Sequence, residues 1–370
     1  MKRAACFLCA CLLLFAIARA DVLPGGEREA PRYATQFELE HGGDGCTLVT
    51  LAGEDRFLIV PEDGAVPEGL PEDVVVLKQP LDHIYLAATS AMDLISALGG
   101  VDSVTLSGTQ ESGWYIPAAV EAMRRGRMRY AGKYSAPDFE MLLEDGCQLA
   151  VESTMIYHTP EVKEQIEALG VPVLVEHSSY ESHPLGRMEW VRLYGALLGK
   201  EAEAERVFSE QMAALETVLA AEKTGRTVAF FSVNAMGLIN VRKSGDYIVK
   251  VIELAGGEYA LRSLDETDNA LSTMNIQMED FYAGARDADF LIYNSAIEGE
   301  LESLSQLTAK NDLFSSFKAV ENGRVYCTGR NLFQETMGLG RLILDIHEIL
   351  TVDDPDAQRL TYLHRLKQDE

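Results

Sequence analysis

Residues 185–222 read LGRMEWVRLYGALLGKEAEAERVFSEQMAALETVLAAE and lie near the middle of a chain of 370 residues. Residues 201–222 are rich in Ala, Glu, Leu and Met, which favour helices. The apolar residues in this part recur at helical spacing, with charged residues between them: Ala204, Val207, Phe208, Met212, Leu215, Val218 and Leu219. A helix of about 22 residues is roughly 33 Å long, the width of a small domain. We therefore expect one long helix that joins two halves of the chain.

Short apolar runs alternate with helical patterns on both sides of this stretch. The runs that read as buried strands are residues 84–87, 103–106, 148–152 and 171–175 before it, and residues 227–233, 290–293 and 324–327 after it. Alternating strands and helices are typical of parallel sheets with helices on their faces. The sequence therefore predicts an α/β fold of two Rossmann-like lobes with parallel sheets, joined by the long inter-lobe helix.

The remaining segments complete a division of the chain into five parts. Residues 47–51 and 56–60 flank Gly53-Glu54-Asp55 and predict a β-hairpin, and residues 356–367 read as a terminal helix. The parts that we expect are a signal peptide (1–20), an N-terminal extension with the β-hairpin (21–80), an N-terminal α/β lobe (81–184), linking helices (185–222) and a C-terminal α/β lobe (223–370).

The first twenty residues have the pattern of an export signal. Lys2 and Arg3 precede an unbroken apolar run, residues 4–17, and Ala18-Arg19-Ala20 is a small-x-small cleavage site. We expect the mature chain to begin at Asp21. The protein would then be secreted across the cytoplasmic membrane and be periplasmic or associated with the cell surface; lipid anchoring of its start stays open.

Charge and cysteine content exclude several classes of protein. The formal net charge is −26, and such an acidic surface argues against nucleic acid or anionic membrane as a partner. Three of the six cysteines belong to the signal peptide. Cys46, Cys147 and Cys327 remain, an odd and widely spaced set that predicts neither a disulfide framework nor a cysteine-based metal site.

Four stretches of the chain, in order and spacing, carry a resemblance to a known family. They are PDFE at 137–140, EQIEALGVPV at 164–173, YGALLGKEAEAE at 194–205 and AVENGRVY at 319–326. Between about residue 84 and residue 350 the chain resembles the periplasmic-binding proteins of ABC importers for iron–siderophore complexes, haem and cobalamin. Residues 33–80 lie outside this pattern.

The resemblance implies a monomer with a ligand cleft between two lobes, no enzymatic activity and no intrinsic cofactor. Its partners would be an ABC permease dimer with its ATPase. The family carries one glutamate on each lobe that docks on arginines of the permease. These would be Glu140 and Glu279, each on a short helix that leads into a buried strand; ordinary solvated helix residues are the alternative.

Candidate ligand-binding residues lie after strands or at the entry of the long helix, where ligands bind in α/β folds. They are Trp114, Tyr157, His158, Arg187, Trp190 and Arg330. Aromatic planes and arginine forks suit flat or anionic ligands. For Trp190, packing of the helix onto the lobes is an equal alternative.

The resemblance implies an iron complex, a siderophore or haem, as the transported ligand, with cobalamin or another corrinoid as the alternative. A free Zn²⁺ or Mn²⁺ ion is a further alternative, because His177 and His183 flank Glu181 and together offer ligands for such an ion. A two-lobed secreted enzyme is the last alternative. However, the chain has no nucleotide-binding or nucleophile motif.

Overall fold

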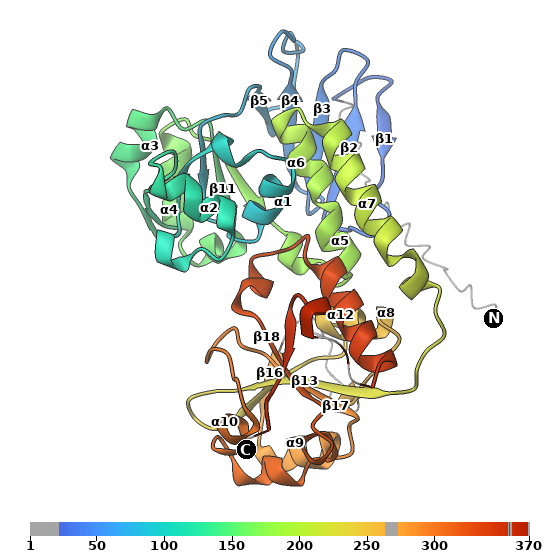
Figure 1. The fold of residues 1–370 in the computed structure, drawn as a ribbon. Helices are drawn as coiled ribbons and strands as arrows, with labels where there is room; N and C mark the ends of the chain where they lie inside the picture. Colours follow the sequence, from blue (N-terminus) through green and yellow to red (C-terminus); the bar gives the residue numbers. More distant parts are fainter. Residues whose placement is uncertain (1–21, 263–272, 354, 356, 369–370) are drawn as a thin grey trace, which may run out of the picture.

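A computed structural model describes residues 22–262, 273–353, 355 and 357–368 of the chain. The described residues form a β-sheet extension, two α/β lobes and a set of linking helices (Figure 1). The expected signal peptide and its cleavage site lie outside the described residues. No helix among the described residues is both long and apolar enough to cross a membrane.

The extension is a sheet whose strands lie in sequence order, and it is larger than the expected hairpin. Its strands are β1 (Glu27–Glu29), β2 (Phe37–His41), β3 (Thr47–Leu51), β4 (Asp55–Val60) and β5 (Val74–Lys78). β3 and β4 pair antiparallel, which confirms the hairpin, and β5 adds to β4 in parallel. Both faces are buried: Phe37 and Val49 belong to the main core, whereas Leu48 and Leu58 pack with Leu23.

The N-terminal lobe contains a fully parallel sheet with strand order β12-β11-β6-β7-β8. The strands are β6 (Ile84–Leu86), β7 (Val104–Ser107), β8 (Arg129–Tyr130), β11 (Leu149–Ser153) and β12 (Val173–Glu176). The helices are α1 (Ala91–Ala97), α2 (Pro117–Arg124), α3 (Phe139–Asp145) and α4 (Pro160–Ala168). A small antiparallel pair, β9 (Gly132–Lys133) and β10 (Ala136–Pro137), precedes α3. This lobe confirms the parallel sheet expected from the repeated strands and helices.

The linking segment folds into three helices: α5 (Pro184–Glu189), α6 (Val191–Leu198) and α7 (Glu201–Leu219). α7 is the expected long helix and has 19 residues. It is separated from α6 by a turn at Gly199, whose φ of 63° is a left-handed conformation that glycine adopts without strain. α7 packs on α6 and on α12 of the C-terminal lobe and therefore contacts both sides of the molecule (Figure 1).

The C-terminal lobe contains a mixed sheet with strand order β16-β14-β13-β17-β18-β19, and β15 pairs with β13. The strands are β13 (Thr227–Val233), β14 (Ile239–Arg242), β15 (Glu258–Tyr259), β16 (Thr273–Ile276), β17 (Phe290–Tyr293), β18 (Val325–Thr328) and β19 (Leu363–Arg365). The helices are α8 (Tyr247–Leu254), α9 (Met278–Ala285), α10 (Leu304–Thr308), α11 (Lys318–Glu321) and α12 (Leu339–Thr351). β13, β17 and β18 are parallel, as expected.

The expected terminal helix is wrong where the structure describes it. Residues 363–365 instead form β19, which pairs antiparallel with β18 through Tyr326–Arg365 and Thr328–Leu363. Leu363 and Leu366 are buried by this pairing. The segment can pair with the free edge of β18 and bury its leucines in the core. These contacts outweigh the local helical pattern, because most helical stability in proteins comes from packing.

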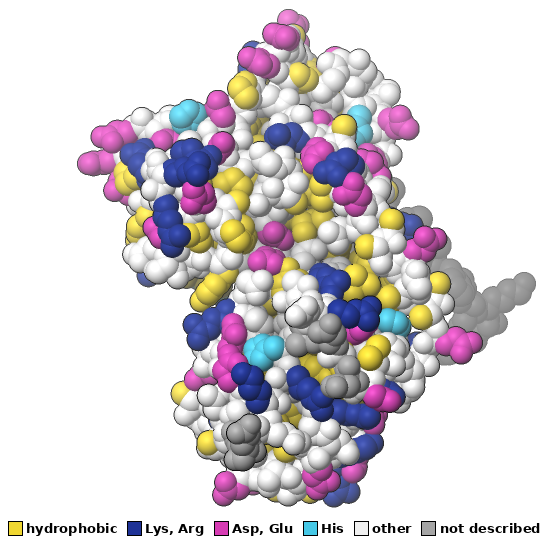
Figure 2. Space-filling model, in the orientation of Figure 1, with side chains coloured by type: hydrophobic (Ala, Val, Ile, Leu, Met, Phe, Trp, Pro, Cys, Tyr) yellow, Lys and Arg dark blue, Asp and Glu magenta, His cyan; other side chains and the backbone are white. Residues whose placement is uncertain are grey.

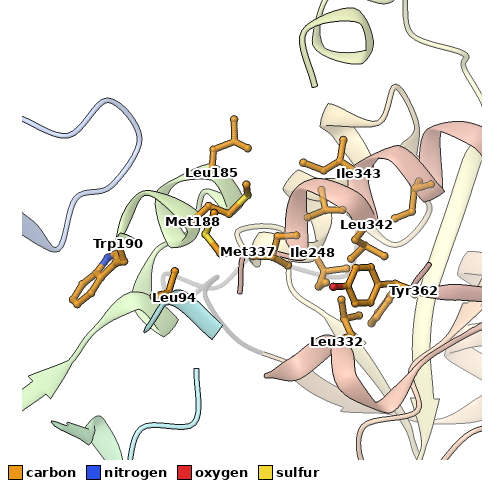
Figure 3. Close-up of a cluster of buried hydrophobic side chains, with 14 of the residues drawn as sticks. Leu94, Leu185, Met188, Trp190, Ile248, Leu332, Met337, Leu342, Ile343 and Tyr362 are labelled. Atoms are coloured by element: carbon orange, nitrogen blue, oxygen red, sulfur yellow. The ribbon is translucent and has the colours of Figure 1, made fainter. Parts of the chain in front are cut away.

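The two lobes share one hydrophobic core (Figure 3). Leu94 of α1 and Met188 of α5 lie beside Ile248 of α8 and Leu342 of α12. Met337, in the loop before α12, lies between the two groups. Packed interiors resist gradual deformation, so this shared core restricts how far one lobe can move relative to the other.

Three cysteines are buried and unpaired: Cys46 in the extension, Cys147 in the N-terminal lobe and Cys327 in the C-terminal lobe. Burial raises the pKa of each thiol to about 11.

Candidate ligand-binding cleft

The loops that follow the parallel strands of the two lobes meet across a cleft. The amide of Tyr115, in the loop after β7, donates to Gln334 Oε1 at 2.8 Å. Gln334, in the segment after β18, donates through Nε2 to the carbonyl of Gly113 at 2.7 Å. Ligands in α/β proteins bind beyond the carboxyl ends of strands, so these loops form the candidate site.

A second pair of contacts joins α1 to the segment before α12. Thr336 Oγ1 donates to the carbonyl of Ser90 at 2.9 Å, and the Met337 amide donates to Asp93 Oδ2 at 2.7 Å. Burial raises the pKa of Asp93 to about 6, although the Met337 amide opposes this shift. The base of the cleft is therefore closed by contacts between the lobes.

A pocket of about 280 Å³ opens between the lobes at this place. Tyr115 lines it from the N-terminal lobe, and residues 295–299 and Arg330 line it from the C-terminal lobe. The Arg330 amide donates to Glu300 Oε1 at 2.9 Å, while its side chain is exposed beside Gly299. Of the expected ligand-binding residues, Arg330 is the one that lies in this pocket.

Exposed apolar side chains are concentrated in loops that follow the strands. Six of the eleven large apolar side chains found exposed among the described residues follow the carboxyl ends of strands: Tyr115, Met155, Tyr157, Tyr180, Met236 and Ile297. Figure 2 shows hydrophobic side chains along the boundary between the lobes in this view. Exposed apolar groups that gather in this way indicate a binding surface.

The loops after β11 and β12 bring three aromatic rings together. The Tyr157 hydroxyl hydrogen-bonds His177 Nε2 at 3.2 Å, and the two ring centroids lie 6.2 Å apart. The rings of His177 and Tyr180 have centroids 5.7 Å apart. Burial lowers the pKa of His177, so this imidazole is neutral at pH 7. We call Tyr157, His177 and Tyr180 the aromatic trio.

Tyr157 was expected at the site, and His177 was considered only as a ligand of a free metal ion. Tyr180 was given no role in the sequence analysis. The sequence feature that could have indicated both residues is their position directly after β12, which ends at Glu176. His158 lies exposed next to Tyr157. The structure therefore brings Tyr157 together with His177, which was weighed as a metal ligand, and with Tyr180, which the sequence did not single out.

Both tryptophans occupy the core, and their positions do not support the expected ligand contact. Trp114 is 4% exposed, and its Nε1 donates to Ser107 Oγ at 3.1 Å. Trp190 is fully buried; its Nε1 donates to Glu181 Oε1 at 3.0 Å, and its ring meets Phe37 edge-on. The packing alternative weighed for Trp190 describes its place in the structure.

Arg187 joins the two lobes. Its Nε donates to the carbonyl of Glu181 at 2.9 Å and its Nη2 donates to the carbonyl of Ser179 at 2.6 Å. The guanidinium carbon lies 3.6 Å from the centre of the Tyr247 ring on α8. These contacts occupy two of its five N–H donors and one face of the guanidinium, so they give Arg187 a structural role between the lobes; its expected ligand contact stays a prediction.

Glu181, the carboxylate of the metal-ion alternative, is not free to bind an ion. Glu181 accepts hydrogen bonds from the amides of Thr35 and Gln36 and from Trp190. His183 Nδ1 accepts from the Leu185 amide at 3.2 Å. Among the described residues, one group of side chains has ligand atoms close enough together to hold a metal ion. It consists of Glu300, Glu302 and His364 and is largely exposed.

The expected docking glutamates are both exposed. Glu140 lies in the first turn of α3, and Glu279 lies in the first turn of α9. The α3 helix is fixed at its start by Asp138, whose side chain accepts from the Met141 amide at 3.0 Å. Each lobe therefore presents one of these carboxylates to solvent on a short helix.

No family model matches the chain. Curated relatives include two uncharacterized lipoproteins of Methanocaldococcus jannaschii. MJ0878 is 25% identical over 313 residues, which is 82% of this chain and 73% of that protein. MJ0872 is 23% identical and covers 83% of this chain and 79% of its own length.

Solved structures with a similar fold include three periplasmic binding proteins. The heme-binding protein HutB of Vibrio cholerae has a TM-score of 0.59 and 16% identity, over 74% of this chain and 98% of its own. A heme-binding protein from Pseudomonas aeruginosa has a TM-score of 0.57 and 17% identity, over 77% and 98%. The catecholate-siderophore binding protein VctP from Vibrio cholerae has a TM-score of 0.57 and 13% identity, over 73% and 94%.

These similarities define the class of fold: the chain is a mixed α/β protein with the two-lobed architecture of periplasmic binding proteins. The solved neighbours are nearly fully covered, whereas about a quarter of this chain lies outside each match. This chain therefore carries structure beyond the shared two-lobed fold.

Proposed function

We propose that the protein is an extracytoplasmic substrate-binding protein of an ABC importer. It captures a metal chelate, an iron complex such as a siderophore or haem, and delivers it to a membrane permease dimer with its ATPase. The observation that carries this proposal is the set of exposed apolar side chains at the strand ends of both lobes in a fold shared with periplasmic binding proteins.

The chemistry of the cleft suits a chelate better than a bare ion. A chelated metal presents a broad organic surface, and Tyr115, Tyr157 and Tyr180 offer exposed rings for such a surface. A bare ion needs several converging ligand atoms, and Glu181 is already saturated by hydrogen bonds. The solved neighbours are described as heme- or siderophore-binding proteins, and the sequence of this chain contains no nucleotide-binding or nucleophile motif.

A spectroscopic and calorimetric screen of the purified chain tests this function. Ferric hydroxamates, ferric catecholates, haem and cobalamin are the probes, and we expect one of them to bind with a saturable signal. Binding of cobalamin alone would replace the iron complex by a corrinoid as the ligand. Binding of free Zn²⁺ or Mn²⁺ without any chelate would overturn the proposal.

The docking role of Glu140 and Glu279 is part of this function and has its own test. Paired carboxylates on two lobes can engage two arginines of a permease, and such charges mainly set orientation and association rate. We expect Glu140→Ala with Glu279→Ala to slow uptake into reconstituted vesicles and to leave soluble ligand binding unchanged. Glu144→Ala with Asp280→Ala, on the same helices and exposed, is the matched control. Normal transport by the first pair, or loss of ligand binding, would show that the role is wrong.

A further inference from the structure

The N-terminal extension is bound to the segment that follows β12, through Glu181. Given the proposed binding function, we propose that Glu54 and Asp55 of the extension and the aromatic trio form one wall of the ligand site. This acidic, aromatic wall selects a cationic or neutral metal chelate over an anionic one.

The aromatic trio is open to a ligand. Tyr157 is 52% exposed and Tyr180 is 51% exposed, so both rings offer a face to solvent. His177 lies between them and is held by the Tyr157 hydroxyl. An array of aromatic faces attracts cations through the ring quadrupole and accepts apolar groups as well.

The extension is held beside this array by Glu181, the residue that directly follows Tyr180. Glu181 accepts from the amides of Thr35 and Gln36 at 2.9 Å each. The carbonyl of Gln36 in turn accepts from the amide of Ala52 at 2.8 Å, in the turn between β3 and β4. This chain of hydrogen bonds places the β3–β4 turn next to the loop that carries His177 and Tyr180.

The carboxylates of that turn act on the aromatic trio. Asp55 opposes the effect of burial on the pKa of His177, and Asp55 and Glu54 both raise the pKa of Tyr157, after burial as the first cause. Such effects require that the carboxylates lie near the rings. The turn, from Ala52 to Asp55, is exposed, so its negative charge faces the same solvent as the two tyrosine rings.

No cation cancels this charge among the residues that the structure describes. Neither Glu54 nor Asp55 makes an ion pair there, and the adjacent Arg56 is paired with Asp73 instead. The arginine on the neighbouring helix, Arg187, is stacked on Tyr247 of the other lobe. The wall therefore combines aromatic faces with uncompensated negative charge, which favours a positive ligand and repels an anionic one.

The substrate class follows from this charge. A ferric catecholate carries several negative charges and would meet repulsion at the wall. A hydroxamate chelate of zero or positive charge, or a cationic corrinoid, would meet attraction. Among the chelates considered for the proposed function, we therefore expect the protein to bind those without a net negative charge.

A charge series of probes tests the inference. The cationic ferrioxamine B, the neutral ferrichrome and the anionic ferric enterobactin are titrated at low salt by calorimetry, and aquocobalamin is compared with cyanocobalamin and haem. We expect the cationic or neutral members to bind and the anionic ones to bind more weakly. Glu54→Gln with Asp55→Asn should weaken a cationic probe about fivefold, should leave a neutral one within twofold, and should lose its effect at high salt.

The chain offers a matched control for this pair. Glu62 and Asp63 have the same order and are exposed, but they follow β4 at its opposite end, about 20 Å away. Glu62→Gln with Asp63→Asn should change no affinity. Tyr180→Ala should weaken cationic and neutral probes alike, about tenfold.

The outcomes separate the inference from the function on which it rests. Tighter binding of the anionic probes, or unchanged affinity for the cationic probe in Glu54→Gln with Asp55→Asn, would overturn the acidic wall and leave the binding function intact. Failure of every chelate, haem and cobalamin to bind would overturn both.

Discussion

Two joints of the molecule differ in how they are built: the joint between the extension and the linking helices, and the joint between the two lobes. In the first, Glu189 of α5 accepts from the amides of Arg32, Tyr33 and Ala34 at 2.8, 2.7 and 2.9 Å. Its side chain is fully buried. Glu181 adds the same kind of contact to the next two residues of the extension.

Apart from Arg187, which stacks on Tyr247, the contacts between the lobes use mainly neutral groups. Gln334 exchanges hydrogen bonds with the backbone of residues 113–115, and Thr336 donates to Ser90. A single carboxylate, Asp93, takes part. Below these contacts the lobes share the core shown in Figure 3.

This contrast between the joints indicates which part of the molecule can move. A buried carboxylate that accepts hydrogen bonds from several amides makes strong, charge-assisted bonds. If the carboxylate is removed, the buried amides lose their acceptor, which lowers the stability of the fold. Neutral hydrogen bonds at the edge of a cleft exchange with water at little cost. We therefore expect the extension to stay fixed to the linking helices and the cleft to open slightly.

Removal of the carboxylate at the first joint should have the largest effect. Glu189→Ala leaves three amides without a partner, and we expect a loss of about 3–5 kcal/mol in the free energy of unfolding. Urea unfolding followed by circular dichroism measures it. Glu216→Ala, an exposed glutamate on α7, is the control and should change stability by less than about 0.5 kcal/mol. A similar small change for both variants would show that the joint is not held as described.

Glu152 is a buried carboxylate of the other kind, one whose removal should stabilise the fold. Both oxygens of Glu152 on β11 are buried and have no hydrogen-bond partner among the described residues, and burial raises the pKa of this carboxyl to about 8. As the pH rises from about 4.5 to about 8, the unfolded chain releases this proton and the folded chain keeps it, so stability falls. We expect Glu152→Gln to raise the free energy of unfolding by about 2–3 kcal/mol at pH 8 and by little at pH 5. An equal effect at both pH values would contradict the assigned protonation.

The joint between the lobes should respond more weakly. Gln334→Ala removes two hydrogen bonds at the edge of the cleft, and we expect a loss of about 1 kcal/mol. X-ray scattering should also detect a slightly larger radius of gyration. Gln165→Ala, exposed on α4, controls for loss of a glutamine side chain. A loss as large as that of Glu189→Ala would remove the contrast between the joints.

Ligand binding should cause the smallest change. Because the lobes share a packed core, we expect a small shear rather than a wide hinge motion. Scattering profiles with and without a bound chelate should nearly superimpose. A large fall in the radius of gyration would show that the core separates on opening.

The regular elements were predictable because each has a local signal. The apolar stripe of residues 201–222 predicted α7, and the apolar runs predicted β13 and β17. The short segment at residues 363–365 fits a helix or a strand, and the free edge of β18 decided for the strand. That edge is not visible in local sequence.

The site was only partly predictable because its contacts are long-range. Arg32 and Glu189 are 157 positions apart, and no periodic pattern links them. A tryptophan after a strand has the same sequence signal whether it faces a ligand or the core, and for Trp190 the core was the outcome. Tyr157 was found from its position after β11, but its partner His177 required the parallel pairing of β11 with β12.

The three buried cysteines divide the molecule into separately observable parts. Cys46, Cys147 and Cys327 report on the extension, the N-terminal lobe and the C-terminal lobe in turn. A thiol that is buried and held in its protonated form reacts with alkylating reagents when its surroundings open. Pulsed alkylation followed by peptide mass analysis would therefore give an opening rate for each part of the unmodified chain, without any engineered label.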